Sequence, residues 1–212
     1  LTANGGVYAA GIGGGGSSGN NIEIKGGTIN ATGGGRGAGI GCGYGESVSN
    51  IIISGGIVNA TGRIGGAGIG TGASDDSNHS KAEKIYITGG TVVATADSGG
   101  TRVDGAGIGG GEFSTASEIY ISGGNVKAIS NLERSIGSGN GATPMGSVLN
   151  NATDNIAVSE LKINADTVPT DLSILTGSNS YTYSIDGIKL FDDNGEKYFN
   201  IYIPINDAEN GE

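Results

Sequence analysis

Residues 22–31 read Ile-Glu-Ile-Lys-Gly-Gly-Thr-Ile-Asn-Ala, and this ten-residue phrase decides the fold because the chain repeats it. Its pattern is Ile-x-Ile-x-Gly-Gly-x-(Ile/Val)-x-Ala, and it recurs without insertion or deletion at residues 51–60, 85–94 and 119–128. A second phrase, Ala-Gly-Ile-Gly, alternates with the first. It begins at Ala10, Ala38, Ala67 and Ala106, with a degraded copy at residues 134–137. Such internal repetition is typical of a solenoid.

The spacing of the repeats predicts a parallel β-helix. The Ile of the second phrase falls at positions 12, 40, 69, 108 and 136, so the steps are 28, 29, 39 and 28 residues. Each repeat holds three short segments with period-2 alternation, separated by Gly-rich corners, and none has helical periodicity. Three strands and three corners make one three-sided coil, and coils stack at ~4.8 Å through parallel pairing. We expect an all-β fold in which residues 1–147 form about five coils of a right-handed parallel β-helix, with about 28–29 residues per coil.

The alternation also predicts which side chains face the interior of the coil. In the first full repeat the inward positions are Ile22, Ile24, Ile29, Ala31, Ala38 and Ile40. The glycines of the second phrase are predicted to project outward as a strip of bare backbone, at Gly39, Gly41, Gly68, Gly70, Gly107 and Gly109. Two enlarged corners flank this strip, one at residues 71–80 and one that contains Asp97, Arg102 and Asp104. We expect these loops to wall a shallow groove with a glycine floor.

The repeat lapses after Gly137, and the sequence predicts a β cap at residues 148–212. Strands are expected at residues 160–164, 180–185, 188–191 and 198–204, and Asp193-Asn194-Gly195 predicts a β-hairpin between the last two. Because the end of a solenoid is an open sheet edge, this acidic and aromatic-richer segment is expected to cover it. Residues 206–212 are predicted to be a flexible tail.

Composition narrows the class of protein. Gly is 45 of 212 residues, but it has no three-residue period and Pro is only 3, which excludes a collagen triple helix. No stretch of 18 apolar residues is present, so no membrane insertion is expected. The formal net charge is −10 and no basic stripe is available, which argues against nucleic acid as a partner. Cys42 is the single cysteine and excludes an internal disulfide, and residues 1–3 are expected to be the end of a missing copy of the first phrase.

The two alternating phrases resemble the Gly-rich repeats of secreted and cell-surface proteins from gut and soil bacteria. The layout of residues 1–137 is also similar to a β-helical carbohydrate-binding module of cellulolytic clostridia, which binds plant polysaccharide. The acidic, calcium-binding corners of that module have no regular counterpart in this sequence. The resemblance implies an extracellular or cell-surface location, and the second likeness implies a polysaccharide or cell-surface glycan as partner.

The outward columns of the strands lack the pattern of a hydrolase or lyase. One column reads Glu23, Ile52, Tyr86 and Tyr120, and the next reads Lys25, Ser54, Thr88 and Ser122. Glycoside hydrolysis requires two facing carboxylates, and neither column supplies a pair. We therefore expect no enzymatic activity and no cofactor. A polysaccharide-acting enzyme is a minor alternative that rests on fold analogy alone.

Tyr86 and Tyr120 are the strongest candidates for binding. They occupy the same outward position on neighbouring coils and are predicted to stack ~4.8 Å apart. Exposed aromatic faces stack on sugar rings, and Thr88 and Ser122 beside them can supply hydrogen bonds. The alternative is an aromatic cross-strand pair that stabilises the sheet by ~0.2–1 kcal/mol.

The enlarged corners hold the other candidate ligand contacts. Asp75, Asp76 and His79 lie within five positions, but their spacing matches no defined metal motif, so a solvated loop is favoured and no metal is expected. Arg102 and Asp104 belong to the second enlarged corner. The sequence as a whole predicts a non-catalytic structural or adhesin-like segment of a larger bacterial protein. The alternative is a carbohydrate-binding module that uses the Tyr86/Tyr120 face or the glycine-floored groove.

Overall fold

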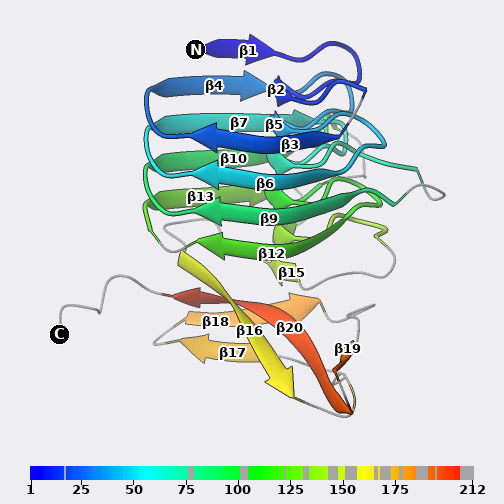
Figure 1. Cartoon of the computed structure of the whole chain (residues 1–212), viewed down its shortest axis with the longest axis vertical. Helices are drawn as coiled ribbons and strands as arrows, with labels where there is room; N and C mark the ends of the chain where they lie inside the picture. Colours follow the sequence, from blue (N-terminus) through cyan, green and yellow to red (C-terminus); the bar gives the residue numbers. More distant parts are fainter. Residues whose placement is uncertain are drawn as a thin grey trace.

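The computed structural model describes residues 1–16, 18–75, 79–100, 105–121, 123–130, 134–142, 148–150, 157–164, 167, 173–176, 179–184, 191–193 and 195–205. Every regular element in these ranges is a β-strand. Figure 1 shows coils stacked from the N-terminus downward onto a smaller group of crossing strands. The strands at the front run to the left and those behind them run to the right, so the coil is right-handed. The predicted all-β, parallel β-helical architecture is confirmed.

The first of the three sheets is the most regular. Its five parallel strands are β1 (Thr2–Asn4), β4 (Thr28–Thr32), β7 (Ile57–Arg63), β10 (Thr91–Asp97) and β13 (Asn125–Ser130). Like residues pair with like, so that Ala31 lies opposite Ala60 and Ala60 lies opposite Ala94. The repeated phrases are therefore stacked in register, as the fixed spacing predicts.

A second sheet carries the Ile-x-Ile half of each repeat. Its parallel strands are β3 (Gly19–Ile24), β6 (Val48–Ile53), β9 (Lys81–Ile87) and β12 (Thr115–Ile121). The strands begin about three residues earlier than the sequence predicts, because a left-handed residue interrupts each one without ending it. These residues have φ between 54° and 61° and are Asn21, Asn50, Lys84 and Glu118. At the first two, Asn50 Nδ2 donates to Asn21 Oδ1 over 2.7 Å, and Asn is a residue that tolerates this conformation.

The third sheet contains the Ala-Gly-Ile-Gly phrase, and its glycines overturn one prediction. Its parallel strands are short: β2 (Ile12–Gly13), β5 (Ile40–Gly41), β8 (Ile69–Gly70), β11 (Ile108–Gly109) and β14 (Arg134–Gly137). The glycines predicted to form an exposed strip are buried instead, namely Gly39, Gly41, Gly68, Gly70, Gly107 and Gly109. A Cβ on Gly41 would lie 1.8 Å from the carbonyl oxygen of Gly70, so it is the next coil that excludes a side chain there. The glycine-floored groove predicted from the sequence is therefore wrong.

The interior of the coil consists of stacked aliphatic side chains. Of the inward positions predicted in the first full repeat, Ile24, Ala31, Ala38 and Ile40 are buried. Ile22 and Ile29 pack on the core but are only partly buried. Ile22 lies on β3, the edge strand of its sheet, and Ile29 lies just before the point where the pairing of β4 with β1 begins, at Asn30 and Thr2. In later coils the equivalent side chains are fully buried, for example Ile51 and Val58.

The cap continues two of the three sheets with antiparallel strands. Strand β15 (Val148–Asn150) pairs with β14, and β16 (Ala157–Asn164) pairs with β12. The other cap strands are β17 (Ser173–Thr176), β18 (Asn179–Ser184), β19 (Phe191–Asp193) and β20 (Glu196–Ile205). The predicted hairpin is confirmed between β19 and β20, where Gly195 N donates to Asp192 Oδ1 over 2.8 Å. The tail predicted at residues 206–212 lies outside the described residues.

Candidate functional site

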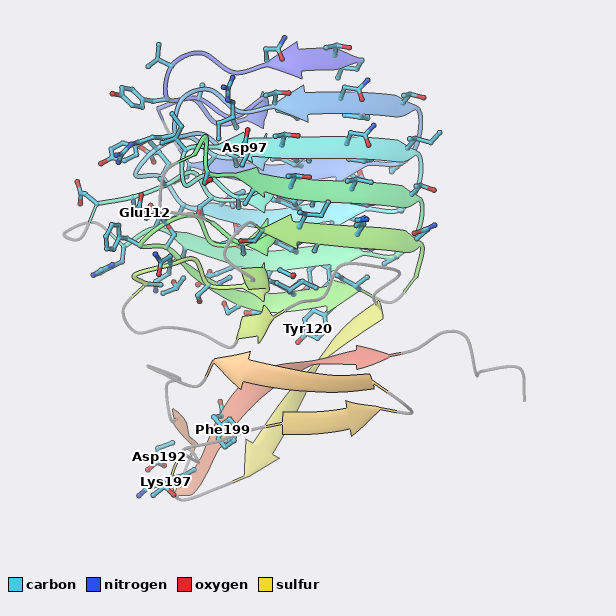
Figure 2. All side chains as sticks on the ribbon, turned by 180° about the vertical axis from the view of Figure 1, so that it is seen from behind. Asp97, Glu112, Tyr120, Asp192, Lys197 and Phe199 are labelled. Carbon is cyan, nitrogen blue, oxygen red and sulfur yellow. The ribbon has the colours of Figure 1, made fainter. Side chains whose placement is uncertain are left out.

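Tyr86 and Tyr120 form the stacked pair that the sequence predicts. They lie opposite each other on β9 and β12 and their ring centroids are 5.4 Å apart, with the ring planes 5° from parallel. Both side chains are partly buried, and Ile52 of β6 takes the same position one coil earlier. Figure 2 shows Tyr120 on the last coil, next to the cap.

The direction of these rings limits how they can bind a ligand. Because the planes are parallel and the rings are neighbours along the stacking direction, each ring turns one face to the other. Sugar stacking requires an open ring face, and the stack takes one face of each ring. The geometry therefore favours the alternative interpretation, an aromatic ladder that stabilises the sheet. A binding role for the pair stays a prediction.

The remaining predicted site residues are dispersed or lie outside the described part. Thr88 is exposed after β9, and its backbone N–H donates to the carbonyl oxygen of Ile53 over 2.9 Å. Asp75 is exposed, and His79 Nδ1 lies 3.2 Å from the carbonyl oxygen of Phe113. Four predicted residues lie outside the described ranges, namely Asp76, Arg102, Asp104 and Ser122. In the part of the chain that is described, no three His, Cys, Asp or Glu side chains are grouped closely enough to hold a metal ion.

A second aromatic cluster, which the sequence analysis missed, lies on the corners beside the third sheet. Tyr8 follows β1, and Tyr44 follows β5 one coil later. Their ring centroids are 5.6 Å apart with the planes tilted by 42°, and Tyr8 is 56% exposed. The Arg36 guanidinium carbon lies 5.3 Å from the centroid of the Tyr44 ring, within the range of a cation–π contact. Arg36 makes no ion pair among the described residues.

Glu112, which follows β11, places a carboxyl group on the same side of the stack. The residue is 5% exposed, and Figure 2 shows it among the corners. Burial raises the pKa of Glu112, and the positive charge of Arg36 opposes this shift. No ion pair or side-chain hydrogen bond of its carboxyl group is found among the described residues. Among the described residues, Ser80 Oγ is the one fully buried side-chain nitrogen or oxygen without a hydrogen-bond partner. The oxygens of Glu112 also lack a partner in this part of the chain, so they are not fully buried and keep some contact with solvent.

The corner cluster could not be found by searching for columns of like residues. Tyr8 and Tyr44 occupy different corners of the repeat, one before and one after Ala-Gly-Ile-Gly, and they are 36 positions apart. The backbone brings the two corners together, because Tyr44 N donates to the carbonyl oxygen of Tyr8 over 2.9 Å. Corners from successive coils therefore lie side by side in the folded chain, and the spacing of the repeats does not predict which corners meet.

Cys42 lies close to this region but has the properties of an inert thiol. It is fully buried, and its Sγ donates to the carbonyl oxygen of Glu46 over 2.8 Å. Burial raises the pKa of Cys42 to about 12, with a smaller contribution from the negative charge of Glu46, against a lowering by a backbone hydrogen bond from Gly72. Because the thiolate is the reactive form, this cysteine is not a nucleophile at neutral pH.

The fold defines the molecule as a solenoid of the parallel β-helix class with a β cap. The family model described as a β-helix repeat matches residues 22–44, 51–73, 85–112 and 119–143, so the chain carries four β-helix repeats. Neither a curated protein nor a solved structure matches the chain. Among the described residues no helix is long and apolar enough to cross a membrane.

Proposed function

We propose that this chain is a non-catalytic, extracellular or cell-surface structural segment of a larger bacterial protein, with an adhesin-like role. The observation that carries the proposal is the residue-by-residue registration of the coils. A stack of this kind buries a continuous aliphatic ladder and holds every outward side chain at a fixed spacing. Such a rod separates and displays neighbouring parts of a protein without any catalytic group.

The outward strand positions support the same proposal. The sheet of β1, β4, β7, β10 and β13 exposes mainly Thr and Asn, among them Thr28, Asn30 and Asn59. Asn59 Nδ2 donates to Asn30 Oδ1 over 2.9 Å, which links neighbouring coils on the outside as the aliphatic ladder does on the inside. On the next face the Lys25 and Glu23 side chains form an exposed ion pair of 3.1 Å. These are the contacts of a durable solvated surface.

The location is tested on intact cells of the organism that produces the protein. An antibody against the folded chain should label unpermeabilised cells, and added protease should remove the signal without lysis. Labelling that requires permeabilisation would contradict the proposal. The sequence on either side of the repeats in the gene product gives an independent check, because an export signal or a wall anchor is expected there.

A carbohydrate-binding module is the second candidate, and one observation favours it. The chain holds two pairs of tyrosines from neighbouring coils, and in one of them Tyr8 exposes more than half of its surface. A glycan array with the purified chain tests this function directly. Loss of glycan binding in the double variant with Tyr86→Ala and Tyr120→Ala would assign the binding site to the predicted face. The absence of binding to plant, host and microbial glycans would favour the structural role alone.

A further inference from the structure

The corners beside the third sheet interleave in a regular order. The same backbone bond recurs in three successive coils: Tyr44 N donates to Tyr8 O over 2.9 Å, Ala73 N to Arg36 O over 2.9 Å, and Glu112 N to Gly65 O over 2.7 Å. Two further bonds join the coils along this line, from Gly45 N to Ala73 O and from Ser74 N to Glu112 O. We call this line the corner strip, and its members in order are Tyr8, Tyr44, Arg36, Ala73, Gly65 and Glu112.

The chemistry of the corner strip changes from aromatic to polar along its length. Tyr8 and Tyr44 are in ring contact at one end, and the guanidinium of Arg36 continues the contact from Tyr44. Glu112 lies at the other end. The positive charge of Arg36 lowers the pKa of this carboxyl group while burial raises it, so the two side chains act on each other electrostatically although they form no ion pair.

The two positions between Arg36 and Glu112 hold the smallest side chains available. Ala73 is fully buried, and Gly65 has a φ of +87°. A Cβ on Gly65 would lie 3.0 Å from Glu112 Oε2 and 3.2 Å from the Cβ of Ala73. The carboxyl group of Glu112 therefore rests over Gly65, in space that any larger residue at this position would take.

We infer that the corner strip is a binding site for a glycan built of pyranose rings. This inference deepens the proposed adhesin-like role, on which it rests for the presence of glycans at the same location. Pyranose rings have an apolar face that stacks on aromatic rings, and Tyr8 is an aromatic residue with 56% of its surface exposed. Their hydroxyl groups both donate and accept hydrogen bonds, which suits the guanidinium of Arg36 and the carboxyl group of Glu112, neither of which forms an ion pair within the described part of the chain.

The buried carboxyl group gives the site its selectivity. Because the oxygens of Glu112 keep some contact with solvent, a ligand that covers the carboxyl group must replace the hydrogen bonds of water, and a ligand hydroxyl that reaches Glu112 does this. An apolar ligand of the same shape cannot do so. Glycans with hydroxyl groups next to an exposed ring face should bind, whereas aromatic or aliphatic compounds of similar size should not.

The experiment uses the purified full chain on an array of plant, microbial and host glycans, followed by calorimetric titration of the strongest binder. Tyr8→Ala should weaken binding about tenfold, because it removes the exposed ring. Glu112→Gln retains the shape of the side chain and should also weaken binding. Ile57→Ala is the control, since it removes an exposed apolar side chain from β7 of the first sheet, outside both tyrosine pairs, and should leave binding unchanged. Unchanged thermal melting of Tyr8→Ala excludes a folding defect.

Two results would overturn the inference. One is the absence of binding to any glycan on the array, and the other is full binding in both Tyr8→Ala and Glu112→Gln. Neither result would contradict the proposed structural role, which the labelling of intact cells tests separately. Conversely, a chain that binds glycans through the corner strip but is found inside cells would refute the proposed location and leave the site in place.

Discussion

At the scale of single residues, glycine performs the most specific task in this chain. Gly41 and Gly70 have φ values of 138° and 137°, a region that other residues rarely adopt, and each faces the carbonyl oxygen of the glycine one coil later. These positions require the absence of a Cβ for two reasons, backbone angle and space. The abundance of glycine thus reflects the close approach of successive coils.

Gly41→Ala is expected to destabilise the protein by about 3 kcal/mol, because the added Cβ meets the backbone of the next coil and the left-handed conformation is strained for alanine. Urea unfolding measures the change. Gly26→Ala is the control: nothing lies within 4 Å of its added Cβ, so an effect within about 0.5 kcal/mol is expected. Equal effects of the two substitutions on stability would show that close packing of the coils is not the reason why position 41 requires glycine.

Glu112 is expected to make stability depend on pH. Its pKa is raised in the folded protein, chiefly by burial, so between the ordinary Glu value of about 4.3 and the raised value the folded state binds more protons than the unfolded state. The contribution of protonated Glu112 to the free energy of unfolding is therefore present at low pH and is lost as pH rises through the pKa of the folded state. Glu112→Gln, which does not titrate, should gain stability relative to the natural chain as pH rises above the ordinary pKa of a Glu side chain. Parallel stability profiles of the two proteins would contradict this.

At the scale of strands, the sequence predicts what is periodic and misses what is not. The aliphatic ladders and the β19–β20 hairpin follow from period-2 alternation and from one Asn-Gly turn, so both could be read from residue types. The left-handed residues of the second sheet share no residue type, as Asn21 and Glu118 illustrate, and leave no pattern to detect. The Ala-Gly-Ile-Gly glycines misled the prediction because a residue without a side chain does not reveal which way it faces.

The candidate site illustrates the same limit. Tyr86 and Tyr120 could be predicted as a pair because they share one position in the repeat. The corner strip could not, because Tyr8 and Glu112 come from different kinds of corner in coils that are far apart in the sequence. Contacts of this kind depend on how the corners interleave, and repeat spacing alone does not determine that.

The stacked tyrosines should contribute coupled stability to β9 and β12. A double-mutant cycle with Tyr86→Ala and Tyr120→Ala is expected to give a coupling free energy of about 0.5–1.5 kcal/mol, since parallel rings interact beyond the area that each buries. Chemical denaturation of the two single variants and the double variant measures it. Strictly additive effects would mean that the rings are neighbours without interacting.

At the scale of the whole molecule, the cap solves the problem of the open sheet edge by reversing strand direction. Another parallel strand would require another full coil, whereas an antiparallel strand can follow a shorter connection. In the cap, β15 pairs antiparallel with β14, and β16 pairs antiparallel with β12. Figure 1 shows β16 running diagonally below the last coil, across β20. Within the described residues, the Thr/Asn-rich sheet has β13 as its last strand, so the cap extends two sheets of the three.

The solenoid requires that successive coils stack in register, and disulfide trapping tests this registration. In a Cys42→Ala background, Thr61→Cys and Thr95→Cys place two thiols on paired positions of β7 and β10, within the span of a disulfide. Moving the second cysteine to Val93, which pairs with Asn59, places it about 8 Å away, beyond that span. We predict that mild oxidation of the folded chain cross-links the first pair and leaves the second reduced. Cross-linking of the second pair in preference to the first would contradict the stacked, in-register coil.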